Sequence, residues 1–178
     1  MALRDIILYP HDVLSTKAAP VGEVDDALRQ LVDDMIETMY DAPGIGLAAP
    51  QIGILQRLTV IDISSEENPD KLYTFINPQI VHAEGRIVWE EGCLSIPGAY
   101  EKVERSNKIV VQALDRDGEE FELEADGLLA VAIQHEIDHL DGVVFLDHLS
   151  SLKRRMALKK YKKNLEAMEK ERLEKQNS

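Results

Sequence analysis

Apolar residues between Asp25 and Asp41 recur every three or four positions, the period of a helix with one buried face. The sequence therefore predicts an amphipathic helix there, with its apolar side packed against the rest of the protein. The segment Asp41-Ala42-Pro43-Gly44 ends it, because proline and glycine interrupt helices. Upstream, the apolar stretch Ile6 to Leu8 precedes a short turn of helix expected at His11 to Ser15.

Short apolar runs bounded by polar or turn residues follow, and these are typical of β-strands. Leu58 to Ile63 is apolar enough for a buried strand, and Ser64 to Asp70 is a polar loop. Asp115-Arg116-Asp117-Gly118 carries the Asp-Gly signal of a hairpin turn. The other expected strands are Leu72–Ile76, Gln79–Ala83, Arg86–Glu90 and the two hairpin arms Ile109–Leu114 and Glu119–Glu124.

The stretch from Leu128 to Ile133 is uniformly apolar and predicts a buried helix that continues through His139. Asp126 suits its N-cap and Gly142 its end. A further, highly charged helix is expected from Ser150 or Ser151 onward. Together these elements predict an α+β fold, with antiparallel β-sheets packed around the central helix and a helix at the C-terminus.

The buried helix carries the motif His-Glu-x-x-His. Positions four apart on a helix share a face, so His135 and His139 can bind one metal ion, with Glu136 beside them as a base for water. A catalytic metal usually has a third protein ligand and an open position. The single cysteine, Cys93 in Glu91-Gly92-Cys93-Leu94-Ser95, is the best candidate, because a thiolate binds borderline divalent metals strongly.

Simpler interpretations of these residues remain open at this point. A lone cysteine is more often a small buried apolar residue than a ligand. Two histidines on a helix can be hydrogen-bonded core residues, and a bare His-Glu-x-x-His match also occurs by chance.

A third segment, Gly44-Ile45-Gly46-Leu47-Ala48-Ala49-Pro50-Gln51-Ile52-Gly53, indicates tight backbone that another group approaches closely. Taken with the Cys93 and His135 motifs, it resembles the three motifs of peptide deformylase, in the same order. Cys93 lies 42 residues before His135, and the middle motif resembles the bacterial form. The resemblance runs from about Ile6 to Leu149.

The resemblance implies removal of the N-formyl group from the initiator methionine of new polypeptides, with release of formate. It implies that Cys93, His135 and His139 bind the metal and that Glu136 is the acid/base. Gln51 and the backbone N–H of Leu94 would hold the formyl oxygen. The metal it implies is Fe(II), with Zn, Ni or Co as possible substitutes.

The methionine side chain needs an apolar slot. On the helix, Leu128, Val131 and Ala132 share the face of His135 and could line that slot. The resemblance adds Ile45 and Trp89. The backbone of the glycine segment could pair with the substrate as an added strand, with Gly92 on the other side. Simple core packing is an equal alternative for the three helix residues. The substrate-binding residues expected are Gly44, Ile45, Gly46, Trp89, Gly92, Leu128, Val131 and Ala132.

Four more charged or polar residues lie in or near these motifs, and the resemblance bears on three of them. Glu91 and Arg105 would form an ion pair that supports the Cys93 loop, the alternative being two solvated charges. Asp138 could support the site but suits the helix surface better. Tyr100 stands where some members of the family carry a basic residue.

At 178 residues the chain suits one domain, with a catalytic part over 1–150 and a charged C-terminal helix over 151–178 that belongs to the same domain. One cysteine excludes an internal disulfide and suits a reducing compartment, and no targeting pattern starts the chain. These features predict a cytoplasmic enzyme with no membrane partner.

The net charge of −13 combines −19 over residues 1–152 with +6 over residues 153–178. The acidic body disfavours DNA binding, whereas Lys153 to Lys163 holds seven basic residues and no acidic one. We expect a solvated helix that docks through Leu152, Met156 and Leu165, and a sharper hypothesis is contact with ribosomal RNA.

Two rival functions stay open on the sequence alone. A zinc metallopeptidase or other metal amidase would use the same His-Glu-x-x-His chemistry without needing Cys93. A non-enzymatic ribosome-associated protein would act through the basic tail and leave the histidines structural.

Overall fold

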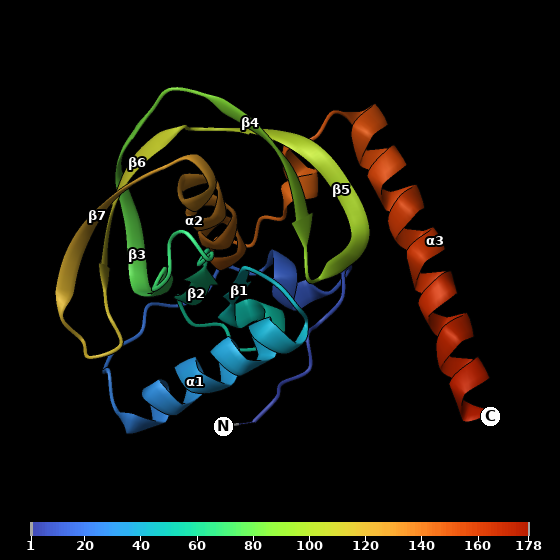
Figure 1. The fold of residues 1–178 in the computed structure, drawn as a ribbon, viewed down its shortest axis with the longest axis horizontal. Coiled ribbons are helices and arrows are strands. Elements are labelled where there is room, and N and C mark those ends of the chain that lie inside the picture. The colour runs from blue at the N-terminus through green and yellow to red at the C-terminus, as the bar shows by residue number, and fades with distance from the viewer. Residues whose placement is uncertain (1, 178) are drawn as a thin grey trace.

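The computed structural model describes residues 2–177 and confirms the α+β architecture. Five strands form an antiparallel sheet in the order β1-β2-β3-β6-β7, and β4 pairs with β5 in a second sheet. Figure 1 shows α2 in the middle of the molecule, with strands curving around it, α1 below and α3 along one side. The elements are 3-10 helix η1 (Asp12–Ser15), α1 (Asp26–Asp41), β1 (Gly46–Ala48), 3-10 helix η2 (Ala49–Ile52), β2 (Leu58–Asp62), β3 (Leu72–Glu84), β4 (Ile87–Cys93), β5 (Ile96–Arg105), β6 (Lys108–Leu114), β7 (Glu120–Asp126), α2 (Gly127–Leu140), 3-10 helix η3 (Phe145–His148) and α3 (Ser151–Gln176).

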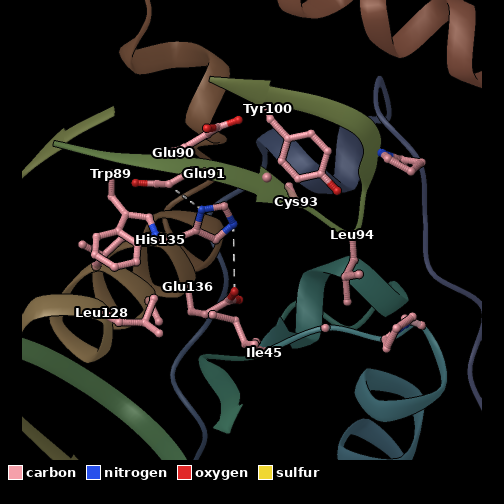
Figure 2. Close-up of a pocket in the computed structure, with 18 of the residues that line it drawn as sticks. Ile45, Trp89, Glu90, Glu91, Cys93, Leu94, Tyr100, Leu128, His135 and Glu136 are labelled. Carbon is pink, nitrogen blue, oxygen red and sulfur yellow. Dashed lines mark hydrogen bonds and ion pairs between the residues drawn. The ribbon is translucent and has the colours of Figure 1, made fainter. Parts of the chain in front are cut away.

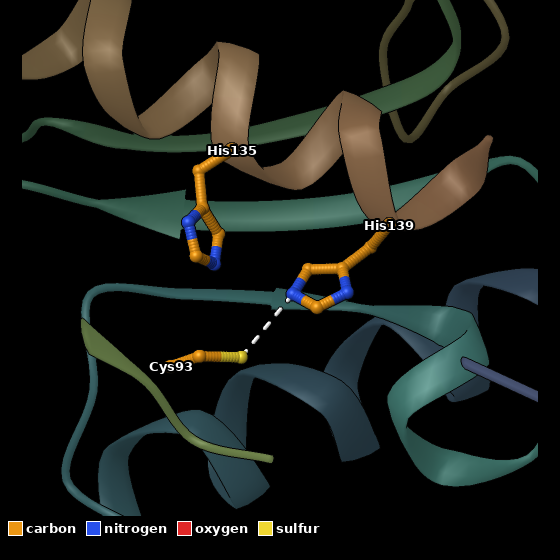
Figure 3. A group of neighbouring side chains, drawn as sticks. All are labelled: Cys93, His135 and His139. Atoms are coloured by element: carbon orange, nitrogen blue, oxygen red, sulfur yellow. Dashed lines mark hydrogen bonds between the residues drawn. The ribbon is translucent and has the colours of Figure 1, made fainter. Parts of the chain in front are cut away.

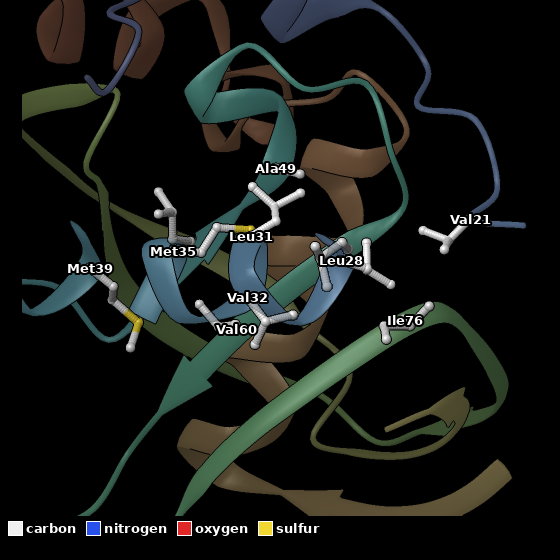
Figure 4. Close-up of a cluster of buried hydrophobic side chains, with 11 residues drawn as sticks. Val21, Leu28, Leu31, Val32, Met35, Met39, Ala49, Val60 and Ile76 are labelled. Atoms are coloured by element: carbon white, nitrogen blue, oxygen red, sulfur yellow. The ribbon is translucent and has the colours of Figure 1, made fainter. Parts of the chain in front are cut away.

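Helix α1 forms where the apolar period predicted it. Asp25 caps its start by accepting a hydrogen bond from the Leu28 N–H at 2.9 Å. Its apolar face, including Val32 and Met35, packs against strands β1 and β2 in one buried cluster (Figure 4). Full burial of one such side chain stabilises the fold by about 1.5–3 kcal/mol. The cluster therefore holds β1 firmly against α1.

Helix α2 also begins and ends as expected. Asp126 occupies the N-cap position, although its side chain accepts no hydrogen bond from the helix. Gly142, just beyond the end, has φ +76, a conformation that favours glycine. Ile133 and Ile137 pack into a second cluster with residues of the five-stranded sheet, which fixes how the helix is rotated about its axis.

The structure differs from the predicted strands in one long element. Leu72–Ile76 and Gln79–Ala83 are halves of the single strand β3, which continues through Asn77 and Pro78. The pairing with β6 shifts register between Ile76 and Gln79, and Asn77 adopts φ 51. This bulge accommodates a proline that cannot donate to the ladder, so the strand bends without ending.

Two other strands were not predicted. Strand β5 contains Pro97 and Gly98, which hide its strand character in the sequence, but it pairs with β4 from Ile87 to Cys93. The glycine segment holds the three-residue strand β1, paired with β2 at the edge of the larger sheet.

Helix α3 starts after Ser150, whose hydroxyl caps it, but its docking face was predicted wrongly in part. Leu152 and Met156 are 60% and 49% exposed, whereas Ala157 and Tyr161 are buried and Leu165 is packed beside them. The Tyr161 hydroxyl donates to the Tyr9 carbonyl at 2.6 Å. Ala157 and Tyr161 therefore make the contact that was expected of Leu152 and Met156, whereas Leu165 docks as predicted.

Within residues 2–177, no helix has the length and apolar character that crossing a bilayer requires.

Candidate metal centre and active site

Cys93, His135 and His139 meet at one point in the fold, as Figure 3 shows. One ligand atom from each lies within 4.8 Å of the other two. The Cys93 Sγ lies 3.3 Å from Nε2 of His139. The two imidazole rings are 5.0 Å apart between centroids, at an interplanar angle of 71°.

Two different elements supply these three side chains. His135 and His139 are one helical turn apart on α2, so both face the same side. Cys93 ends β4, at the turn that leads into β5. The pairing of β4 with β5 shifts register between Glu91 and Cys93, and this irregularity presents the thiol toward the helix.

The residues present fit a divalent metal ion. One thiol and two imidazoles are ligands suited to soft or borderline divalent metals. His139 is almost fully buried, and its Nδ1 has no hydrogen-bond partner among the residues described. Burial and the neighbouring His135 lower the pKa of His139 well below its ordinary value, which keeps the ring in the neutral form that binds metals.

His135 is oriented by a buried ion pair. Glu91 accepts a hydrogen bond from His135 Nδ1 at 2.9 Å. The Arg105 Nε and Nη2 atoms donate to the two oxygens of Glu91 at 2.7 and 2.8 Å. Burial by itself would raise the pKa of Glu91, but the hydrogen bonds from Arg105 and His135 outweigh burial and hold it at about 2. An ionised Glu91 keeps the proton on His135 Nδ1, which leaves Nε2 to bind a metal.

Glu136 lies beside the ligand cluster. Its Oε1 is 3.9 Å from His135 Nε2, and its Oε2 is buried with no hydrogen-bond partner in the part of the chain described. Burial, helped by the charge of Glu91 and opposed by His135, raises the pKa of Glu136 to about 7. A carboxyl group with that pKa can take up and release a proton near neutral pH.

Gln51 approaches the cluster from η2. Its side-chain oxygen accepts a hydrogen bond from the Ala48 N–H at 2.9 Å, which fixes the orientation of the amide. Its NH2 group then faces Ser95 Oγ at 3.1 Å and Cys93 Sγ at 3.5 Å. Leu94 lies in the turn between β4 and β5, directly after Cys93. Both residues therefore border the place where the ligand atoms converge.

A cavity of about 530 Å³ opens in front of these residues (Figure 2). It is lined by every residue expected from the sequence to bind substrate, as well as by Gln51, Cys93, Leu94, His135 and Glu136. Val131 and Ala132 are also buried, and Ala132 belongs to the core cluster, so lining and packing are not exclusive. Lining residues that the sequence analysis did not assign to the pocket are Ala42, Pro43, Glu90, Glu91, Pro97, Gly98 and Tyr100.

Pro97, Gly98 and Tyr100 reach the pocket because they lie on β5, the strand that was not predicted. Tyr100 packs over Gly92, where a side-chain carbon would lie 2.5 Å from the tyrosine ring.

The expected ion pair of Glu91 with Arg105 is buried rather than solvated, and Asp138 joins it through Arg105. The pair of Glu91 with Arg105 was expected through the resemblance, whereas its burial and its link to Asp138 were not.

A His-Glu-x-x-His helix that meets a cysteine thiol at a cavity is typical of metal-dependent hydrolases. Comparison with known proteins identifies the family within that class. Residues 3–155 match the family profile of polypeptide deformylase. The chain is 56% identical to a peptide deformylase of Hydrogenovibrio crunogenus over 161 residues, which is 90% of this chain and 94% of the relative.

Solved structures agree with this assignment. A crystal structure of a peptide deformylase from Legionella pneumophila superimposes with a TM-score of 0.89 at 48% identity, covering 94% of this chain and 98% of that one. One from Synechococcus elongatus in complex with actinonin gives a TM-score of 0.84 at 45% identity, covering 88% and 86%.

The chain belongs to the polypeptide deformylase family. It is a divalent-metal-dependent hydrolase that removes the N-formyl group from the N-terminal methionine of newly synthesised proteins and releases formate. The metallopeptidase and the non-enzymatic alternatives are set aside by this assignment.

Proposed function

We propose that Cys93, His135 and His139 hold the metal of this deformylase and that Glu136 is its acid/base. The observation that carries the proposal is the convergence of three ligand atoms within 4.8 Å of one another, with a Glu136 oxygen 3.9 Å from His135 Nε2. The metal, when bound, supplies Lewis acidity that makes water a better nucleophile at neutral pH and polarises the formyl carbonyl.

Glu136 moves the proton in both halves of the reaction. Its carboxylate takes a proton from the attacking water, whose oxygen forms the new bond to the formyl carbon. The carbon–nitrogen bond then breaks, and Glu136 gives the proton to the departing amine. The products are formate and a free N-terminal methionine, so the carboxylate is regenerated. The raised pKa of Glu136, about 7, suits both transfers.

Gln51 and the Leu94 N–H stabilise the negative charge that develops on the formyl oxygen. Support for Gln51 comes from its amide orientation, which the Ala48 N–H holds so that the NH2 group faces the site. Loss of one such donor typically costs about 100- to 1000-fold in kcat.

The methionine side chain occupies the apolar part of the cavity, lined by Leu128, Val131 and Trp89. The substrate main chain pairs with the Ile45–Gly46 segment on one side and approaches Gly92 on the other. This is supported by the position of β1 at the edge of its sheet, where one side of the strand is open to pairing. Main-chain pairing accepts varied sequences after methionine, as a general processing enzyme requires.

Fe(II) is the metal we propose for the cell, with Zn, Ni or Co able to replace it in the same ligand set. An iron enzyme with a thiolate ligand loses activity in air, because Fe(II) is oxidised and its oxidation brings oxidation of the bound thiolate with it. Aeration of matched Fe and Ni preparations tests this: the iron form should lose formate release while the nickel form keeps it. An iron form that stays fully active would contradict the proposal.

We further propose that the enzyme acts in the cytoplasm and that residues 1–150 and 151–178 make one domain. Burial of Ala157 and Tyr161 against the body supports a single domain.

We also propose that the C-terminal helix contacts ribosomal RNA through the seven basic residues between Lys153 and Lys163. Replacing the exposed Lys159, Lys160, Lys162 and Lys163 with glutamine leaves the buried face of the helix intact. This variant should show weaker, less salt-dependent ribosome binding and full activity on short peptides; unchanged ribosome affinity would refute the contact.

Formate release from formyl-Met-Ala-Ser under anaerobic conditions tests the site assignment. The acetylated and unformylated peptides are the substrate controls, and Cys93→Ser is the protein control. Release that needs both the formyl group and Cys93 supports the proposed ligands. Full activity of a Cys93→Ser protein with its metal retained would remove Cys93 from the ligand set.

A further inference from the structure

A chain of hydrogen bonds runs from the protein surface to His135. His148 on η3 lies 2.8 Å, through Nε2, from Asp138 Oδ2, and Arg105 Nη1 donates to the same oxygen at 2.7 Å. Arg105 continues the chain to Glu91, and Glu91 reaches His135 Nδ1. Four elements, η3, α2, β5 and β4, contribute to it.

Burial increases from the outer end of this chain inward. The side chain of His148 is 39% exposed and that of Asp138 is 23% exposed, whereas Arg105 and Glu91 are each 4% exposed. Exposed ion pairs contribute little on their own. The pair of His148 with Asp138 is different, because the oxygen that accepts from His148 also holds an arginine that is nearly inaccessible to water.

We propose that His148 is a positioning residue for the metal site, acting through Asp138, Arg105 and Glu91 on the orientation of the His135 ring. The proposal rests on the metal-ligand role proposed above for His135. A carboxylate accepts but does not donate, so His148 Nε2 must carry a proton that Asp138 accepts. His148 and Arg105 both donate to Oδ2 of Asp138, so the carboxylate is held in place. In that position Arg105 contacts the carboxylates of Asp138 and Glu91 together.

The orientation of Arg105 decides the orientation of Glu91, because Arg105 holds both of its oxygens. Glu91 in turn sets which nitrogen of His135 carries the proton and how the ring is turned. A ligand must be held within about 0.5 Å and 10–20° to bind well, and that precision comes from the groups behind it.

A second contact places η3 against the same ligand. The Phe145 ring stacks on His135 at 6.4 Å between centroids, with an interplanar angle of 26°. The short helix η3 therefore meets the His135 ring directly through Phe145 and indirectly through His148. Removing the His148 contact loosens η3 on the same side of the site where Phe145 packs.

Two substitutions separate hydrogen bonding from packing. His148→Phe keeps a ring of similar size and loses the donor, whereas His148→Gln keeps a donor at the Nε2 position. His82→Gln is the matched control, since this surface histidine pairs with Glu84 at 3.5 Å, outside the network. His148 is partly exposed, so these variants should fold, which melting of the metal-free proteins would verify.

The test measures metal affinity by competition with a chelator, together with the visible spectrum of the cobalt form. We expect His148→Phe to raise the metal dissociation constant about 10-fold, the low end of the effect of groups that hold ligands directly. Its cobalt spectrum should shift, while His148→Gln and His82→Gln should match wild type. The double variant with Asp138→Asn should lose no more affinity than Asp138→Asn alone, because both act along one path.

Wild-type affinity and spectrum in His148→Phe would overturn the inference. Equal losses in the Phe and Gln variants would also overturn it, since they would assign His148 to packing. Failure of the wild-type protein to bind metal through His135 would instead refute the proposed function, so the two failures are distinguishable.

Discussion

Gly46 on β1 lies so close to Glu136 on α2 that a side-chain carbon at Gly46 would be 2.6 Å from Glu136 Oε1. This approach explains why the strand beside the Glu136 carboxylate, the proposed acid/base, carries a glycine. A backbone without a side chain at this position leaves the carboxylate room to face His135.

Gly46→Ala should therefore displace the Glu136 carboxylate. A displacement of about 1 Å at a catalytic group can cost about 100-fold, so we expect a loss of that order in kcat with metal content unchanged. Steady-state formate release checks this. Gly22→Ala is the matched control, because a side-chain carbon there meets nothing within 4 Å. Wild-type kcat in Gly46→Ala would show that Glu136 does not need this space.

Arg105→Met should destabilise the fold strongly. The substitution keeps an apolar chain but leaves Glu91 and Asp138 without their shared cation, and breaking a buried pair typically costs about 3–5 kcal/mol. Urea unfolding of the metal-free protein measures the loss. Arg86→Met, which removes an 85% exposed partner of Glu104, should change stability by less than about 0.5 kcal/mol. Similar small losses in both would mean that the buried pair is energetically unimportant.

Acid stability should depend on Asp34. Burial opposes its ionisation, but hydrogen bonds from the Ala2 N–H, Gln30 and Arg4 outweigh burial and lower its pKa from the ordinary 3.8. The stabilisation is therefore fully present above pH 3.8 and is lost as the pH falls through the lowered folded-state pKa. The unfolding free energies of wild type and Asp34→Asn should differ at neutral pH and converge at low pH. A difference that stays constant down to pH 2 would argue against this linkage.

Helix α3 should be anchored through Tyr161. Tyr161→Phe removes the hydrogen bond to the Tyr9 carbonyl and should cost about 0.5–1.5 kcal/mol. Tyr161→Ala also leaves a cavity in the cluster and should cost about 3–5 kcal/mol, the range for large aromatic side chains. Met156→Ala, at an exposed position, is the control and should be nearly neutral. A larger effect of Met156→Ala in thermal or urea unfolding would restore the docking face expected from the sequence.

The periodic parts of the chain were predictable because their apolar pattern is local. Helix α1 and the β6–β7 hairpin formed within a residue or two of the expected bounds. Strand β5 was missed, because Pro97 and Gly98 obscure the pattern and pairing with β4 supplies what local preference lacks. The two halves of β3 were predicted as separate strands, because Asn77 and Pro78 interrupt the strand pattern in the sequence.

The residues of the site were predictable by type, since Cys93, His135 and His139 carry distinctive chemistry. Of the contacts that support them, the sequence analysis gave only the ion pair of Glu91 with Arg105. That Gly46 touches Glu136 depends on packing between segments 90 residues apart in sequence. That His148 reaches Asp138 depends on how the chain folds back after α2, which no local pattern records.

The measurement that tests the central claim most directly is metal content and turnover of Glu136→Ala in one anaerobic preparation. Glu136 is proposed as the acid/base and not as a ligand, so the variant should retain one equivalent of metal and lose nearly all formate release. Substantial turnover in the metal-replete variant would contradict the role of Glu136, and loss of the metal would place this residue among the ligands instead.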